Sequence, residues 1–246
     1  MTAPLVTPVP PPVPPPVLEA IGVAKSYRGG DGNEIRVLAG VDLTLARGEM
    51  VAVVGASGAG KSTFLHVLGA LERADAGEVR IGGESTTGAS DEALAELRGR
   101  QVGFVFQFHH LLKEFSALEN VMMPLRILDQ PRAAARARAE ALLDRVGLSA
   151  RRHHRPSELS GGEQQRAAVA RALAAQPQLI LADEPSGNLD HQNAESLHDL
   201  FARLTAELGV GVVVVTHNRS LAARASRVLH LEDGRLHPAE AHEGGV

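Results

Sequence analysis

A glycine-rich loop between a predicted strand and a predicted helix restricts the fold of this chain more than any other feature. Met50–Val54 is a short apolar run rich in valine, and Gly55–Ser62 (GASGAGKS) follows it. The loop fits the phosphate-binding pattern G-x-x-x-x-G-K-[ST]. An apolar periodicity typical of a helix comes next, at Phe64, Leu65, Leu68 and Leu71. A chance glycine turn could match the letters, but the strand before it and the helix after it favour a phosphate loop.

The residue types in this loop suit a nucleotide phosphate. Glycines let backbone N–H groups point inward at an anion, and the helix start that follows adds positive potential. Lys61 would supply charge to the β- and γ-phosphates, and the Ser62 hydroxyl would bind Mg²⁺. The expected nucleotide-binding residues here are Gly55, Ala56, Ser57, Gly58, Ala59, Gly60, Lys61, Ser62 and Thr63.

Two carboxylates follow another apolar run further along the chain. Leu179–Ala182 predicts a buried strand that ends in Asp183 and Glu184. Asp183 is suited to hold Mg²⁺ through its water shell, and Glu184 is the candidate for orienting the attacking water. A solvated acidic loop is the alternative, and the phosphate loop found elsewhere in the chain makes it the weaker interpretation.

The pentapeptide Leu159–Glu163 (LSGGE) predicts a helix start, because Ser160 and Glu163 have the S-x-x-E spacing of a capping box. Two glycines lie in the first turn, where they permit backbone N–H groups to approach an anion closely. A well-capped helix without further function would be the plainer interpretation. The following Gln164–Arg166, and the position between the phosphate loop and the acidic strand, favour a functional one.

Strands and helices alternate along most of the chain, which predicts a parallel α/β core. A short helix is expected at Asp91–Leu97, and residues 108–156 are mostly helical by pattern, with a C-terminal helix stop at Gly147. Further strands are expected at Glu78–Ile81, Val102–Phe106 and Val210–Val215. Ligands gather at the carboxyl ends of strands in such sheets, and the residues that follow these ends are Gly55, Gln107, Asp183 and His217.

In this order the motifs resemble those of the nucleotide-binding subunits of ATP-binding cassette (ABC) transporters, from about Leu18 to about Leu236. The resemblance implies an α/β fold with a P-loop NTPase (RecA-like) core, an N-terminal antiparallel β subdomain and an inserted α-helical subdomain over roughly residues 108–165. It divides the chain into a proline-rich tail, residues 1–17, and one ABC nucleotide-binding domain, residues 18–246. It also implies hydrolysis of ATP with Mg²⁺.

The resemblance implies roles for single residues as well. Tyr27 would stack on adenine, Gln107 would sense Mg²⁺ and the membrane partner, and His217 would reach the γ-phosphate. The implied catalytic residues are Glu184, His217 and Gln107, and the implied metal ligands are Ser62, Gln107 and Asp183.

A homodimer is implied too, because the family completes each ATP site with residues of the opposite subunit. Ser160, Gly161 and Gly162 would contact ATP bound to the partner copy. Asp190 ends the loop Gly187–Asp190, which would cross the dimer interface.

A narrower resemblance, to the ATPase of the bacterial lipoprotein-releasing system, rests on Phe106–Leu112, Phe115–Val121, His154–Glu158 and Ala182–Asp190. It implies two copies beneath two integral membrane subunits, at the cytoplasmic face of the inner membrane, that extract lipoproteins. The membrane subunits would dock near Gln107 to Leu112. Two features depart from the family, since Glu163 stands where glutamine is commonest and the tail has no counterpart.

Other functions fit the motifs less completely. A related exporter of macrolides or peptides, or a cell-division complex, would share nearly all of them. Soluble ABC ATPases of DNA repair or translation generally carry a second cassette, coiled-coil arms or metal-binding cysteines, and none of these is evident. A small-molecule kinase with a phosphate loop would leave Leu159–Glu163 and His217 unexplained.

The composition of the chain limits the classes of partner it can bind directly. With 246 residues the chain can bury one substantial core, and its 44% hydrophobic and 22% charged residues are ordinary for a globular protein. A net charge of −4 gives no positive electrostatic field that would attract nucleic acid. No apolar run has the length of a membrane span, so we expect membrane contact only through partners. The absence of cysteine fits the cytoplasm.

Three remaining segments have plain interpretations. The proline-rich tail favours solvated polyproline II, with docking to a proline-binding module as the alternative. The pairs His109–His110 and His153–His154 chelate poorly, because adjacent side chains diverge on a helix or a strand. The arginine clusters at residues 132–138 and 151–155 are expected to be solvated faces.

Overall fold

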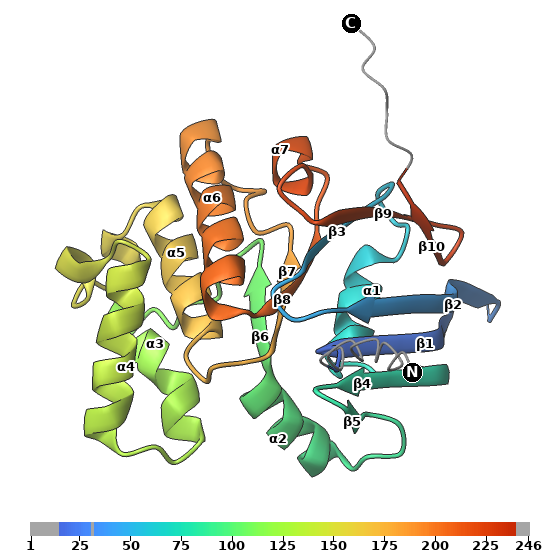
Figure 1. Cartoon of the computed structure of the whole chain (residues 1–246), viewed down its shortest axis with the longest axis horizontal. Helices are drawn as coiled ribbons and strands as arrows, with labels where there is room; N and C mark the ends of the chain where they lie inside the picture. Colours follow the sequence, from blue (N-terminus) through green and yellow to red (C-terminus); the bar gives the residue numbers. More distant parts are fainter. Residues whose placement is uncertain (1–14, 31, 240–246) are drawn as a thin grey trace, which may run out of the picture.

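The structure is a computed structural model and describes residues 15–30 and 32–239. Its centre is a six-stranded sheet of order β10-β9-β3-β8-β7-β6, in which every neighbouring pair is parallel except β9 and β10 (Figure 1). These strands are β3 (Met50–Val54), β6 (Val102–Phe106), β7 (Leu179–Asp183), β8 (Gly211–Val215), β9 (Arg227–Glu232) and β10 (Arg235–Pro238).

Strand β3 shows why the middle of this sheet is continuously apolar. Met50 and Ala52 point into one core, and Val51 and Val53 into the other, because successive side chains of a strand alternate between the two faces. Both faces of the strand are therefore covered, as is usual for parallel sheets.

The register brings four strand ends to one edge of the sheet. Val53 pairs with Val215, Val215 with Asp183, and Asp183 with Phe106. Whatever follows β3, β8, β7 and β6 therefore begins at the same edge. Gly55, Thr216, Glu184 and Gln107 are the residues at these positions or just beyond them.

A second, four-stranded antiparallel sheet of order β2-β1-β4-β5 covers one of the two cores. Its strands are β1 (Leu18–Arg28), β2 (Glu34–Leu45), β4 (Ala76–Ile81) and β5 (Glu84–Ser85). Val17 is buried against it and donates its N–H to the Leu45 carbonyl at 2.9 Å, so the packed chain includes Val17. Most of the proline-rich tail, residues 1–14, lies outside the described residues, as do residues 240–246.

Helices cover the rest of the molecule. They are α1 (Lys61–Leu68), α2 (Asp91–Gln101), α3 (Ala117–Ile127), α4 (Arg132–Arg145), α5 (Gly161–Ala172), α6 (His191–Leu208) and α7 (Arg219–Ala222), with 3₁₀ turns at Ser149–Arg151 and Pro156–Glu158. Helix α1 packs between the two sheets, whereas α5, α6 and α7 belong to the other core. In Figure 1, α3 to α6 lie on the side of the central sheet opposite β1, β2 and β4.

Most element predictions are confirmed, and two need correction. The helix stop predicted at Gly147 is confirmed, since α4 ends before this residue, whose φ is +74°, and buries Ala135, Ala139, Leu142 and Leu143 on one face. Leu71, expected on the face of α1, is instead 45% exposed, because the helix already ends at Leu68 and the chain turns at Gly69. Helix α2 extends to Gln101 rather than ending at Leu97.

Candidate active site at the carboxyl edge of the central sheet

The phosphate loop joins β3 to α1 through a backbone that only glycine tolerates at Gly60. This residue caps α1 with φ +93°, and a Cβ atom there would lie 2.5 Å from Cγ1 of Val37. The Lys61 ammonium group donates to the carbonyls of Gly55 and Ala56 at 3.0 and 2.8 Å. The lysine charge is thus held over the loop, at the start of a helix whose first N–H groups are free to bind an anion.

Glu184 and His217 meet at the same edge, from β7 and from the segment after β8. An Oε1 atom of Glu184 lies 2.8 Å from Nδ1 of His217 and also accepts the His217 backbone N–H at 3.1 Å. The Thr216 hydroxyl donates to Oε2 at 3.2 Å. The carboxylate is only 17% exposed, whereas the His217 side chain is 73% exposed. Three polar groups therefore fix a sheltered carboxylate whose histidine partner reaches outward.

The backbone of Glu184 is left-handed, with φ +44°. This conformation is costly for a residue with a side chain and persists only where the surroundings hold it. The Glu184 N–H donates to the Val215 carbonyl at 2.9 Å, which ties the residue to the end of β8. Asp183 precedes it as the last residue of β7 and is half-buried.

Gln107 lies against the loop Gly187–Asp190. Its Nε2 donates to Oδ1 of Asn188 at 3.0 Å, and Nδ2 of Asn188 donates to the Gln107 carbonyl at 3.3 Å. The two residues stand 81 positions apart in the chain. The sequence indicated a role for Gln107 from its position after a predicted strand and from the family resemblance, and it gave no sign that Asn188 is its partner.

The predicted helix start at Ser160 is confirmed as the capping box of α5. Ser160 Oγ accepts the Glu163 N–H at 3.3 Å, and the Glu163 carboxylate accepts the Ser160 N–H at 2.8 Å. The Ser160 N–H holds the pKa of Glu163 below its ordinary value, with smaller contributions from the Ser160 hydroxyl and from Arg151. Among the described residues, no hydrogen bond joins Ser160–Gly162 to the phosphate loop.

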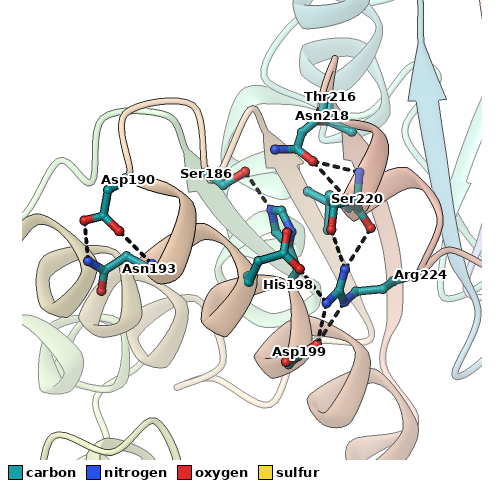
Figure 2. A network of polar contacts seen from close by, with 11 residues as sticks. Ser186, Asp190, Asn193, His198, Asp199, Thr216, Asn218, Ser220 and Arg224 are labelled. Atoms are coloured by element: carbon teal, nitrogen blue, oxygen red, sulfur yellow. Dashed lines mark hydrogen bonds and ion pairs between the residues drawn. The ribbon is translucent and has the colours of Figure 1, made fainter.

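Asn193 connects this helix start to Asp190 and was missed by sequence reasoning. Asp190 caps α6 and accepts the Asn193 N–H at 2.9 Å and Nδ2 at 2.6 Å (Figure 2). A Cβ atom on Gly162 would lie 2.3 Å from Oδ1 of Asn193. Gly162 is thus required by close packing, whereas a Cβ on Gly161 would make only ordinary contact, 3.8 Å from Leu189.

Tyr27, the residue before the last of β1, lies next to the first turn of α1. Its hydroxyl donates to the Glu72 carboxylate and contacts the Thr63 hydroxyl, and the Lys25 ammonium lies 5.5 Å from the ring centroid. Burial, followed by the bond to Glu72, raises the Tyr27 pKa. The ring is 37% exposed and held beside the residue that follows Ser62, so one face could receive a flat ligand.

A sequence model of the ABC transporter family matches residues 38–187. The chain belongs to the ABC transporter family. ATP hydrolysis follows from that membership, and the two sheets and the helical layer have the arrangement of an ABC cassette.

Similar proteins agree with the assignment to the ABC family. The "lipoprotein-releasing system ATP-binding protein LolD" of Geobacter metallireducens is 52% identical over 220 residues, which cover 89% of this chain and 97% of that protein. The protein of the same name from Porphyromonas gingivalis is also 52% identical, over 89% of this chain and 98% of its own length. The solved dimer of the ATP-binding cassette MJ0796 bound to ADP and Pi is 39% identical with a TM-score of 0.80, covering 89% and 96% of the two chains.

Two features are absent from the residues that the structure describes. Over residues 15–30 and 32–239, none of the helices combines the length and apolarity of a membrane crossing. Within the same part of the chain, no three histidine or acidic side chains cluster as a metal site would require.

Proposed function

We propose that this ABC ATPase powers release of lipoproteins from the bacterial inner membrane towards the outer membrane. The observation that supports ATP hydrolysis at this site is the contact between Glu184 and His217. The contact lies at the edge of the central sheet where the phosphate loop begins. The cargo is inferred from relatives named for lipoprotein release, which are 52% identical over about nine-tenths of the chain. A related exporter of macrolides or peptides is the second candidate.

Within one site, each group has a distinct task. The Lys61 ammonium and the N–H groups of Gly55–Thr63 bind the β- and γ-phosphates, and Tyr27 stacks on the adenine. Glu184 accepts a hydrogen bond from the attacking water and orients it in line with the γ-phosphate. His217, which is exposed and anchored by that carboxylate, donates to the phosphoryl group as its charge grows.

The residues assigned to Mg²⁺ have suitable chemistry for it. Ser62, Gln107 and Asp183 offer a hydroxyl, an amide oxygen and a carboxylate, which are the oxygen ligands Mg²⁺ takes. In the described part of the chain no hydrogen bond or ion pair occupies the half-buried Asp183 carboxylate. When bound, the ion neutralises phosphate charge and orients the transferred group.

A second copy of the chain completes each site in our proposal. Over residues 15–30 and 32–239, Ser160–Gly162 make no hydrogen bond to the phosphate loop, and the helix N-terminus that they form suits the γ-phosphate of a partner's ATP. The similarity to a cassette solved as a dimer supports this arrangement. A mixture of Lys61→Ala and Ser160→Arg chains tests it, because each heterodimer would retain one intact composite site. Hydrolysis by the mixture, when neither variant works alone, is expected; an inactive mixture would argue for a site within one chain.

We propose that two integral membrane subunits dock on the segment after Gln107, which places the chain at the cytoplasmic face of the inner membrane. Phe108, Leu112 and Phe115 are 65%, 43% and 37% exposed. Phe115 also lines a groove on α3 with Met122 and Met123. Exposed apolar side chains gathered in this way suit a protein partner.

Reconstitution tests the cargo. The chain is purified with the membrane subunits that bind it, placed in vesicles loaded with an acylated lipoprotein, and supplied with ATP and a soluble acceptor protein. ATP-dependent release of the lipoprotein, absent with Glu184→Gln, is the expected result. Transport of a macrolide or a peptide without lipoprotein release would favour the second candidate.

A further inference from the structure

A chain of polar contacts runs from Thr216 through Asn218 and Ser220 to Arg224 (Figure 2). Thr216, whose hydroxyl bonds the Glu184 carboxylate, accepts the Asn218 N–H at 3.0 Å. The Asn218 side chain in turn accepts the N–H groups of Ser220 and Leu221 at 2.9 and 3.2 Å. The segment that carries His217 is therefore fixed as far as the start of α7.

Arg224 fastens this segment to α6. Its guanidinium donates to the Ser220 hydroxyl at 2.6 Å and to the Ser220 carbonyl at 3.0 Å. The same group donates to Glu195 at 2.8 Å and to Asp199 at 2.9 Å, both on α6. These carboxylates raise the Arg224 pKa, and the pKa of Glu195 is lowered by its bonds to Ser220 and Arg224.

His198 fastens the other side of Glu184 to the same helix. Its side chain is completely buried on α6, and Nε2 lies 2.8 Å from the hydroxyl of Ser186, which itself is 5% exposed. Ser186 stands two residues after Glu184, at the start of the loop that leads to Asp190. Nδ1 of His198 makes no hydrogen bond by geometry, but it lies 3.5 Å from Oε1 of Glu195, the carboxylate that also binds Arg224. The link between His198 and Glu195 is therefore electrostatic. The contacts on both sides of Glu184 therefore lead to the same residue, Glu195.

A buried histidine is a costly choice at this position. Its neighbours on the buried face of α6 are apolar, at Ala194, Leu197, Leu200, Phe201 and Leu204. A leucine would avoid the loss of hydration that a buried imidazole suffers and that lowers the pKa of His198. Since a carboxylate only accepts hydrogen bonds, we assign the imidazole proton to Nδ1, facing Glu195, and leave Nε2 to accept the Ser186 hydroxyl.

We propose that His198 and Glu195 are positioning residues for ATP hydrolysis, which hold Glu184 in its left-handed conformation from both flanks. His198 acts through Ser186, and Glu195 acts through the chain Arg224, Ser220, Asn218 and Thr216. The left-handed backbone of Glu184 needs such support, because it would otherwise relax and turn the carboxylate away from the water. The inference rests on the proposed role of Glu184, and no role in binding ATP is assigned to the supporting residues.

Steady-state hydrolysis by the full chain with its membrane subunits tests this proposal. His198→Leu is expected to lower kcat by about ten- to a hundredfold with little change in KM for ATP, because a misplaced carboxylate slows chemistry without weakening phosphate binding. His198→Gln, which can still accept from Ser186, should recover much of the loss. Ser186→Ala removes the partner hydroxyl with a smaller change in packing and should resemble His198→Leu even if that variant folds poorly.

Thr205→Val is the matched control. Thr205 is the other buried polar residue of α6, but its hydroxyl donates to the Phe201 carbonyl of its own helix at 2.7 Å. The kcat of Thr205→Val should therefore equal that of the wild type. Unchanged kcat in both His198→Leu and Ser186→Ala, with Glu184→Gln inactive, would overturn the positioning role alone. Normal turnover by Glu184→Gln would overturn the proposed role of Glu184 and this inference with it.

Discussion

The carboxylate of Glu184 lies 2.8 Å from Nδ1 of His217, and the same carboxylate accepts the His217 backbone N–H at 3.1 Å. One residue therefore sets both the backbone and the ring orientation of the other. The exposed histidine is free to face a ligand, while the sheltered carboxylate keeps its own orientation through Thr216. The two residues form a unit, and a substitution of either one should change the orientation of the other.

Replacing Glu184 by Gln should leave ATP binding intact and lower phosphate release by about 10²–10⁴-fold, the usual contribution of a positioned base. The amide has the same shape but accepts the water proton poorly. Fluorescent-nucleotide titration and phosphate-release kinetics measure the two effects. Normal turnover in this variant would remove Glu184 from the role.

Replacing Gly162 by Ala should lower the free energy of unfolding by about 1–3 kcal/mol, the usual cost of overpacking. The new methyl group would lie 2.3 Å from Oδ1 of Asn193, which is already held by Asp190. Gly161→Ala is the control, because its methyl group meets Leu189 at 3.8 Å. Urea unfolding of both variants decides the point; equal stabilities would contradict it.

Replacing Arg171 by Gln should weaken binding of the membrane subunits. The Arg171 guanidinium donates to the carbonyls of His110 and His109 at 2.6 and 2.8 Å, which fixes the proposed docking segment to α5. Burial lowers the Arg171 pKa, but a guanidinium stays protonated in proteins and still donates to both carbonyls. Arg203→Gln is the control, since Arg203 donates to the Arg145 carbonyl at 3.0 Å away from that segment. Co-purification of tagged chain with membrane subunits should fall for the first variant only.

His198 should make the protein less stable in mild acid. Burial holds its native pKa below the unfolded value of about 6.5, although Glu195 and Asp199 oppose that shift and Arg224 adds to it. Below that pH the unfolded chain binds a proton that the native chain does not, so the free energy of unfolding falls as pH falls. His198→Gln removes this contribution. Unfolding curves at pH 8 and pH 5.5 should therefore show the variant gaining on the wild type at the lower pH; a constant difference would contradict the assignment.

The parts of the fold that could be predicted are those that local pattern determines. Met50–Val54 and Val102–Phe106 are strands with the predicted bounds, because short β-branched or aromatic runs between polar residues leave little choice. The capping box at Ser160 was equally local. Leu71 was misassigned because periodicity alone does not show where a helix stops.

The contacts behind the site could not be predicted, for a physical reason. His198 meets Ser186 and Arg224 meets Glu195 only once α6 packs beside the segment after β8. The apolar spacing at Ala194, Leu197 and Phe201 puts His198 on the buried face of α6, but it does not show which side chain meets the imidazole there. Asn188 and Asn193 are likewise ordinary loop and helix-start residues until the fold brings them to Gln107 and Gly162.

Gln107 and Asn188 exchange two hydrogen bonds, which join the segment after β6 to the loop after β7. One of these segments leads into the residues proposed to meet the membrane subunit, and the other leads into the loop proposed to meet a second cassette. A shift of either segment by about an ångström would break both bonds, since they weaken steeply with distance and angle. In the proposed complex, movement at the contact with the membrane subunit would therefore be accompanied by movement at the contact between the two cassettes.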